Sequence, residues 1–532
     1  MNQAKRRIFS KHSSLLGAFL AGSILMASAA EGQGGAGEEA PDNTSRAPKY
    51  TFGDTLEEQE AELKTNPLML RFAESRKSRD GDKYRPTYHF TSPESGHNDP
   101  NGLSFWQGRW HLFYQGYPPE DPRQHWGHAV SDDLIHWRDL PYAIYPNPEY
   151  ACFSGSTLVE EERVIACYHG WKGFGNIVAV SDDPLLLNWE KLTGKPVLPS
   201  KNPDGSRPPY GVFDPCIWKK DGMYYQVSTG SVFRSDDLEK WEYLHRFIEN
   251  DRYSLVGDDY ACPYFWPIGD RHILIYFSHM SGGKYLLGDY DKERDKLVVT
   301  AGGDFNFGAA SPAGVHAPSA TPDGEGGIIM NFNMNPGYKQ GGQLMSLPRR
   351  LTLDANGELR QEPAGDIESL RYGRQSAGAT KLPANQEVVI ENIHGNAMEI
   401  IAEIDSKSAP MVEMNVLRSP DKEEFTRIAF FRERGYRGKS LVTIESSYSS
   451  LLPEVLSRAP ETAPIAMEEE KPLKLRVFLD KSSIEVFVNG KQCVAMRVYP
   501  SREDSVGVSL RSQGQDSVLT RLDAWQMKSI YN

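Results

Sequence analysis

Acidic residues stand at matching places in a repeated part of the chain. Asp99, Asp214 and the Asp258–Asp259 pair each lie at the start of a strand-like segment, and Ser154 holds the same place in another copy. If the copies surround one centre, these side chains point towards a common mouth. Carboxyl groups held close together raise one another's pKa, so one can donate a proton while another stays ionised. That chemistry suits cleavage of a glycosidic bond, although a single Asp before Pro or Gly can simply form a turn.

The repeat is marked by a Ser-Asp-Asp turn followed by a tryptophan. Its three copies begin at Ser131, Ser181 and Ser235, so their spacing is about 50 residues. Each copy has the pattern of an inner strand, a turn, an aromatic strand, and a strand that ends in the Ser-Asp-Asp turn. A period near 50 residues with short strands is typical of propeller blades. The sequence therefore predicts an all-β chain with a five-bladed β-propeller over 81–362, with the turns at equivalent blade positions.

The repeat stops after about residue 365, and a different β pattern follows. The segment from Arg476 to Phe487 is strand-like, and Asn489-Gly490 is a typical hairpin turn. Together with strand-like segments at 388–390 and 398–401, this pattern predicts a C-terminal β-sandwich over 366–532.

The first residues of the chain have the pattern of an export signal. A basic start is followed by the apolar stretch 15–26, and Ala27-Ser28-Ala29 fits a small-x-small cleavage site. We therefore expect a signal peptide over 1–29, export to the periplasm or the medium, and no integral membrane span after its removal. Residues 30–80 are expected to form a linker and two short helices separated by Pro67.

Composition excludes several classes of function. The 532 residues are 39% hydrophobic and 25% charged, which is typical of a globular chain long enough for two or three domains. The net charge of −13 disfavours nucleic acid as a partner. The five cysteines form no Cys-x-x-Cys pair and no phosphate-binding loop is visible, so we expect no metal and no cofactor.

The segment His97-Asn98-Asp99-Pro100-Asn101-Gly102 resembles the signature of glycoside hydrolase family 32, the invertases, inulinases and levanases. Further segments resemble later motifs of that family, in the same order: Leu112-Phe113-Tyr114-Gln115, Trp126-Gly127-His128, Phe153-Ser154-Gly155-Ser156, Phe213-Asp214-Pro215, Cys262-Pro263 and Ser482-Ser483-Ile484-Glu485-Val486-Phe487. The resemblance covers about residues 85–530. It implies a five-bladed propeller followed by a β-sandwich, and a retaining hydrolase of β-fructofuranosidic bonds in sucrose or fructans.

The resemblance also implies roles for individual residues. Asp99 would be the nucleophile that attacks the anomeric carbon, and Asp214 would stabilise the transition state. An apolar wall and a set of amide and hydroxyl groups would hold the sugar. The residues expected to form this pocket are Asn98, Gln115, Trp126, Phe153 and Ser154. Packing inside a blade is an equally good explanation for the tryptophan, and a solvated strand position is the alternative for the glutamine.

Two positions depart from the family pattern. Phe213 stands where the family has an arginine, which removes a forked cation from the sugar site. Ala261 stands where the family has its acid/base glutamate, and a methyl group cannot transfer a proton. Asp259 is the expected replacement, because residues two apart in an extended segment share a face, and Asp258 is the alternative if a bulge re-aims it. His279 is a third titratable candidate, for which a structural role is the more common explanation.

Three hypotheses about function follow from the sequence. The first is an exported glycosidase acting on fructose-containing oligo- or polysaccharides. The second is a hydrolase of another furanoside, such as an arabinofuranoside, because Phe213 alters the pocket. The third is a carbohydrate-binding propeller that lost catalysis with Ala261. Linkage, exo or endo action, transfer to another sugar and oligomeric state stay open at this level.

Overall fold

The computed structural model describes residues 42–531, apart from 340, 407, 433–437 and 468–470. The expected signal peptide and the first part of the linker lie outside the described residues. Two helices come first, α1 (Leu56–Thr65) and α2 (Pro67–Ser78). Thr55 caps α1 in a capping box with Glu58, and Asn66 caps α2 immediately before Pro67. The two short helices that the sequence predicts are therefore present. None of the helices in the described part of the chain is long and apolar enough to cross a membrane.

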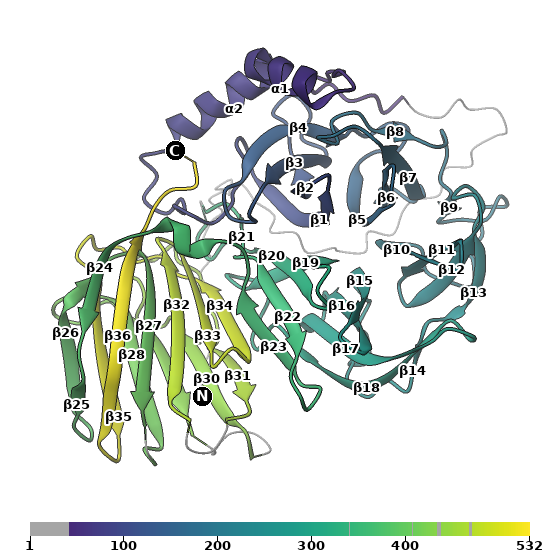
Figure 1. The fold of residues 1–532 in the computed structure, drawn as a ribbon. Coiled ribbons are helices and arrows are strands. Elements are labelled where there is room, and N and C mark those ends of the chain that lie inside the picture. Colours follow the sequence, from purple (N-terminus) through teal and green to yellow (C-terminus); the bar gives the residue numbers. More distant parts are fainter. Residues whose placement is uncertain (1–41, 340, 407, 433–437, 468–470, 532) are drawn as a thin grey trace, which may run out of the picture. The chain divides into compact units, whose positions relative to one another are not determined.

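Five sheets follow one another along the chain (Figure 1). The first contains β1 (His97–Trp106), β2 (Arg109–Gly116), β3 (His125–Ser131) and β4 (Arg138–Ile144). The second contains β5 (Cys152–Val159), β6 (Val164–Gly170), β7 (Gly175–Ser181), β8 (Glu190–Lys191) and β9 (Leu198–Pro199). The third contains β10 (Pro215–Lys220), β11 (Met223–Ser228), β12 (Ser231–Ser235) and β13 (Glu242–Arg246). The fourth contains β14 (Ile248–Glu249), β15 (Ala261–Ile268), β16 (Arg271–Ser278), β17 (Gly282–Asp291) and β18 (Lys296–Asp304). The fifth contains β19 (Val315–Pro322), β20 (Ile328–Met334), β21 (Leu344–Met345), β22 (Arg349–Leu353) and β23 (Leu359–Pro363).

These sheets are the blades of a five-bladed propeller. The strands β1, β5, β10, β15 and β19 each contact the next around a ring, and β19 contacts β1 to close it. Figure 1 shows the five strands around a common centre. Large apolar and aromatic side chains fill the space between neighbouring blades, for example Trp218, Phe247 and Phe265 between the third and fourth. The fold class predicted from the sequence is confirmed.

The Ser-Asp-Asp turns occupy equivalent positions in the first three blades. Ser131, Ser181 and Ser235 are the last residues of β3, β7 and β12, the third strand of each blade. In each copy the serine hydroxyl donates to the second aspartate, which accepts backbone N–H groups two and three or more residues later. The repeat is thus a carboxylate-capped turn that sends the chain to the outer strand.

The C-terminal part forms two antiparallel sheets around a core of aliphatic side chains. A short 3₁₀ helix, η1 (Ile367–Leu370), precedes them. One sheet contains β24 (Arg371–Ala377), β25 (Thr380–Leu382), β27 (Ala397–Asp405), β32 (Leu473–Asp480), β33 (Ser483–Val488), β34 (Gln492–Arg497) and β36 (Ser517–Met527). The other contains β26 (Glu387–His394), β28 (Met411–Arg418), β29 (Thr426–Phe431), β30 (Ser440–Glu445), β31 (Glu461–Ile465) and β35 (Gly507–Gln513). Asn489 and Gly490 both have positive φ, 52° and 62°, in the predicted hairpin between β33 and β34.

A buried charged cluster joins the propeller to the sandwich. Asp480 accepts the backbone N–H groups of residues 87–89 and lies 2.8 Å from His89 Nδ1. Glu485 lies 3.1 Å from His89 Nε2 and accepts a bond of 2.9 Å from Arg349. Burial alone would lower the pKa of His89, but its bonds to the two carboxylates outweigh burial and raise that pKa to about 9. The imidazole is therefore a buried cation between two anions.

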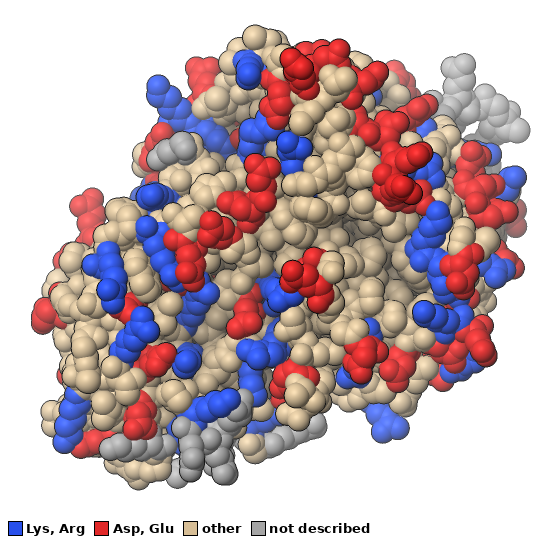
Figure 2. Space-filling view, viewed as in Figure 1, with Lys and Arg blue, Asp and Glu red and all other residues tan. Residues whose placement is uncertain are grey.

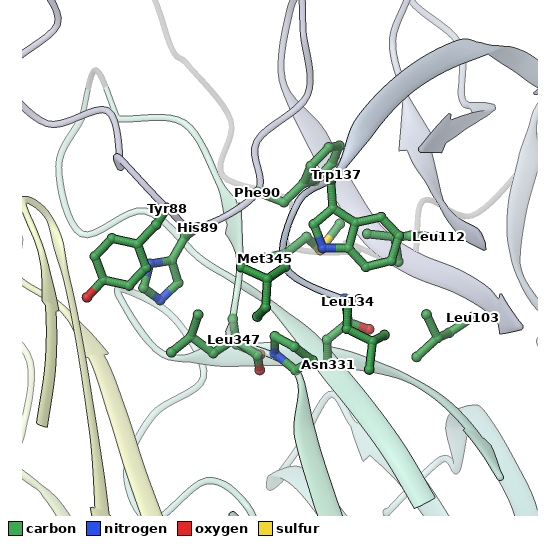
Figure 3. A pocket seen from close by; sticks show the side chains of 13 residues that line it. Tyr88, His89, Phe90, Leu103, Leu112, Leu134, Trp137, Asn331, Met345 and Leu347 are labelled. Carbon is green, nitrogen blue, oxygen red and sulfur yellow. The ribbon is translucent and has the colours of Figure 1, made fainter. Parts of the chain in front are cut away.

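A small cavity lies beside this cluster (Figure 3). Its volume is about 20 Å³, which is room for about one water molecule. Phe90, Leu112 and Trp137 line it, and so do Asn331 and Met345 from the fifth blade. Asn331 Oδ1 is buried without a hydrogen-bond partner, and a single water would satisfy it. The cavity holds none of the predicted site residues and is too small for a sugar.

Candidate active site

The candidate site forms where the inner strands of the blades begin. The ladders of β1, β5, β15 and β19 are interrupted near their starts, between residues 97 and 100, 152 and 155, 261 and 264, and 315 and 318. These irregularities contain Asp99, Ser154, Cys262 and His316, one from each blade. The third blade contributes Asp214, which directly precedes β10. Bulges re-aim side chains that regular pleating would direct elsewhere, so all five blades supply a polar group to one place.

Asp99 is held in its ionised form. Ser154 Oγ donates to Asp99 Oδ2 over 2.7 Å and Gln115 Nε2 donates over 3.3 Å. His316 Nδ1 lies 3.3 Å from the other carboxylate oxygen, close enough for an ion pair. Burial alone would raise the pKa of Asp99, but the groups of His316 and Ser154 outweigh burial and lower it. A carboxylate that stays charged in a largely buried site is suited to act as a nucleophile.

The pKa of Asp214 is shifted in the opposite direction to that of Asp99. Its side chain is buried, and Oδ2 accepts the backbone N–H of Cys262 over 3.0 Å. The Cys262 sulfur lies 3.4 Å from Asp214 and 3.8 Å from Asp99, so it stands between the two carboxyl groups. Burial, helped by the negative charge of Asp99, raises the pKa of Asp214 to about 7. Asp214 Oδ1 is buried without a partner in the described residues, which leaves it available to a bound hydroxyl.

Amide and phenol groups extend the site along the first and fifth blades. Asn98 Nδ2 donates to the Tyr117 hydroxyl over 2.6 Å, and Gln343 Nε2 donates to Asn98 Oδ1 over 2.5 Å. Gln115 also donates to Ser154 over 2.8 Å. Asn98, Gln115 and Ser154 therefore lie together around Asp99, as the sequence predicts.

An aromatic cluster forms on the second and third blades. Phe153 and Trp171 are stacked, with ring centroids 4.5 Å apart and planes 6° apart. Phe213 meets both rings edge-on at 6.4 Å and lies 4.6 Å from the ring of His169. Burial lowers the pKa of His169 to about 4, so this imidazole is neutral at neutral pH. The cluster occupies the place next to Asp214 where the family pattern has a cation.

Trp126 differs from the expectation that it lines the pocket. Its side chain is fully buried and packs between Phe113 of the first blade and Tyr168 of the second. Its indole N–H donates to the Phe153 carbonyl over 2.9 Å. This burial favours the explanation by blade packing, in which the large ring fills the space between two blades and holds the backbone of Phe153.

The region of the missing glutamate also departs from the sequence argument. Residues 258–260 precede β15, and Tyr260 has φ of 51°, so the segment is not extended and simple alternation does not apply. Asp258 accepts bonds from Ser278 Oγ and Ser281 Oγ and from a backbone N–H, which makes it a loop-forming carboxylate. Asp259 Oδ2 lies 2.6 Å from His279 Nδ1, and the pair is half exposed. Ala261 is buried against Ala317 of the fifth blade.

The sequence argument missed several residues of the site. The clearest signal was available for His316, which precedes Ala-Pro at the start of an inner strand much as Asp99, Asp214 and Cys262 precede proline. Cys262 was marked by the Cys262-Pro263 motif, but no site role was assigned to it. The remaining residues have no local signal, because they come from loops and second strands. The missed residues are Tyr117, His169, Trp171, Cys262, His316 and Gln343.

Comparison with known proteins agrees with this architecture. The family model "Glycosyl hydrolases family 32 N-terminal domain" matches residues 89–363, and "Glycosyl hydrolases family 32 C terminal" matches residues 366–526. The chain belongs to glycoside hydrolase family 32. The resemblance seen in the motifs is thus confirmed, and the protein is a glycosidase of the β-fructofuranosidase family.

Relatives within family 32 match most of the chain. A levanase of Bacillus subtilis is 27% identical over 500 residues, which cover 84% of this chain and 71% of the relative. A fructan 6-exohydrolase of Beta vulgaris is 27% identical over 540 residues, covering 84% and 88%. The crystal structure of fructan 1-exohydrolase IIa from Cichorium intybus has a TM-score of 0.73 at 23% identity and covers 84% of this chain and 98% of that one. The last comparison shows a shared fold.

Proposed function

We propose that this family 32 enzyme hydrolyses β-fructofuranosidic bonds of fructans or sucrose with retention of the anomeric configuration. The observation that carries the proposal is the pair of carboxyl groups beside Cys262, with Asp99 kept ionised and the pKa of Asp214 raised to about 7. Two acidic groups with opposed pKa shifts in one mouth can divide nucleophilic and hydrogen-bonding roles between them.

In this mechanism Asp99 attacks the anomeric carbon of the fructosyl unit and forms a covalent ester. Ser154 and Gln115 hold the carboxylate in place through the bonds already described. Asp214, in its protonated form, donates a hydrogen bond from its buried carboxyl to a sugar hydroxyl, an interaction that strengthens as charge develops on the ring. Phe153 and Trp171 offer a flat apolar surface for one face of a sugar.

The test is sugar release by the purified full-length chain from sucrose, inulin, levan and an aryl arabinofuranoside. We expect fructose from at least one of the first three substrates. Asp99→Asn should lower turnover about 10³-fold or more, because an amide of the same shape is not a nucleophile. Asp236→Asn, at an exposed turn of the third blade, is the matched control and should keep full activity.

The anomeric outcome tests the retaining part of the proposal. With methanol as acceptor, double displacement gives the methyl β-fructofuranoside. An α product, or full activity in Asp99→Asn, would overturn the assignment of the nucleophile. Release of arabinose alone would replace the fructoside substrate by another furanoside, and saccharide binding without release by any substrate would leave a binding propeller.

We also propose that the protein is exported. The support is the basic start, the short apolar stretch and the small-x-small site in residues 1–29. A chain expressed with this segment in a Gram-negative host should be found in the periplasm with its first residue at Ala30, as mass spectrometry of the mature protein would show. An uncleaved chain retained in the cytoplasm would contradict export.

A further inference from the structure

Family 32 enzymes place a glutamate at the position of Ala261, so the proton donor of this chain must come from elsewhere. We propose that His279 is the acid/base residue of the site and that Asp259 is its positioning residue. This inference rests on the proposed function and deepens it, because it assigns the step that Ala261 cannot perform.

The register of the fourth blade puts His279 beside the empty position. Ala261 pairs with Phe277 in the antiparallel ladder of β15 and β16. Continuing that register outwards by two residues pairs Asp259 with His279. The structure retains this pairing through side chains, since His279 N donates to Asp259 Oδ1 and Nδ1 lies 2.6 Å from Asp259 Oδ2. The imidazole thus lies in the turn that follows β16, two residues beyond the partner of Ala261, and is bound to the loop that precedes β15.

The ring of His279 is part of the wall that faces the nucleophile. Its centroid is 6.2 Å from the ring of His316, whose Nδ1 is 3.3 Å from Asp99. Phe277 lies under both imidazoles, 5.5 Å from one and 4.2 Å from the other. His279 and Asp259 are each 44% exposed, so a substrate entering the mouth can reach them. A half-exposed acid on the same wall as the nucleophile is placed to protonate a leaving group at the entrance of the site.

The charges around His279 favour its protonated form. Asp259 faces it from the loop before β15, Asp214 from the start of β10 and Asp99 from β1, and the ring of His316 on β19 lies beside it. The hydrogen bond to Asp259 is the largest influence, and with the charges of Asp259, Asp214 and Asp99 it outweighs burial and raises the pKa of His279. The histidine therefore holds its proton more readily than an imidazole without these acidic neighbours would.

The aspartates of the region are less suited to the step. Hydrogen bonding to His279 outweighs burial and lowers the pKa of Asp259, so it stays an anion. Asp258 accepts three hydrogen bonds within its own loop. Asp214 is fixed at the floor of the site by the backbone N–H of Cys262, on the inner side where the sugar ring binds.

The proton balance closes over the two steps. In the first, Asp99 forms a bond to the anomeric carbon, the bond from that carbon to the leaving oxygen breaks, and the imidazolium Nε2–H gives its proton to that oxygen. In the second, water attacks the anomeric carbon and gives a proton to the now neutral Nε2, and the ester bond to Asp99 breaks. Asp259 keeps its charge and holds Nδ1 throughout.

Leaving-group dependence is the first test. His279→Gln should lower turnover of sucrose or inulin about 10²–10⁴-fold, because their leaving oxygens need a proton. An activated aryl β-fructofuranoside needs little acid assistance, so formation of the covalent intermediate should be nearly unchanged for that substrate. His245→Gln, on the outer strand of the third blade, is the matched control and should behave as the wild type.

Rescue of activity by azide is a second test, because azide would not restore activity if His279 were needed only for folding. The ester intermediate of His279→Ala lacks a base to activate water, but anionic azide needs none. We expect azide to restore turnover of the aryl fructoside by His279→Ala, with fructosyl azide as the product, and to leave Asp99→Asn inactive. Absence of azide rescue together with an equal loss on natural and aryl substrates would overturn the proposal.

The pH profile tests the role of Asp259. The alkaline limb of kcat/KM should follow loss of the protons held by His279 and Asp214, and the acid limb should follow protonation of Asp99. Asp259→Asn removes the bond and the charge that raise the pKa of His279, so the alkaline limb should move to lower pH while the acid limb stays. An unmoved alkaline limb would overturn this role. If the wild type cleaves no fructoside, the proposed function fails; if it cleaves fructosides and these variants behave as the wild type, only the assignment of His279 fails.

Discussion

The charged cluster between propeller and sandwich should make the stability of this protein depend on alkaline pH. His89 is buried between Asp480 and Glu485, and its pKa is raised from 6.5 to about 9. A group whose pKa is higher in the folded state stabilises that state fully below its unfolded pKa and loses the contribution as pH rises through the folded value. The free energy of unfolding should therefore fall between about pH 6.5 and pH 9.

The size of this effect follows from the shift. Each pKa unit corresponds to 1.36 kcal/mol, so raising the pKa of His89 from 6.5 to about 9 is worth about 3 kcal/mol. Urea unfolding followed by tryptophan fluorescence at pH 6, 7.5 and 9.5 measures it. His89→Gln lacks the titrating group and should lose this part of the pH dependence, although it is less stable at pH 6 because Asp480 and Glu485 lose the imidazolium between them. An equal fall from pH 6 to 9.5 in both proteins would refute the assignment of the charge to His89.

Three further expectations concern the site. Burial raises the pKa of Asp214 to about 7, so its charge destabilises the fold as pH rises from about 4 to 7. Asp214→Asn should therefore raise the free energy of unfolding at pH 8 by up to about 4 kcal/mol in urea unfolding, while activity is lost. Equal stability of the two proteins at pH 8 would contradict this. Ser154→Ala removes a bond that lowers the pKa of Asp99, so the acid limb of kcat/KM should move to higher pH, and a fixed limb would count against that bond. Trp171→Ala removes the stacked partner of Phe153, and we expect KM for the saccharide to rise about 10-fold with kcat nearly kept, a split that a lower kcat alone would contradict.

Much of the propeller could be predicted because its turns are local. A Ser-Asp-Asp turn needs only residues close in sequence, so its period survives in the sequence and marks the third strand of the first three blades. The same register pointed to Asp99, Ser154 and Asp214. The hairpin at Asn489-Gly490 was predictable for the same reason, since its backbone conformation favours those residue types.

The rest of the site depends on contacts between blades. Whether a tryptophan faces a pocket or a blade interior is set by distant residues, as Phe113 and Tyr168 around Trp126 show. The rule of alternating side chains failed at Asp259 because positive φ at Tyr260 breaks the extended segment, and no local signal marks that residue. The partnership of Asp259 with His279 exists only because β15 and β16 pair across a turn.

The ring of blades has no covalent closure of its own. Each blade is built from strands consecutive in the chain, so no strand of the first blade is lent to the last, and the two ends meet through non-covalent packing of β1 on β19 and β20. Two carboxylates of the sandwich, on β32 and β33, bind both ends of the propeller. Asp480 accepts hydrogen bonds from residues 87–89, just ahead of the first blade. Glu485 accepts hydrogen bonds from Leu347 and Arg349 of the last blade. The sandwich thus holds the first and last blades of the propeller together. If these hydrogen bonds broke, the first and last blades could separate beside Asp99 and His316. The sandwich and the catalytic mouth should therefore unfold in one transition.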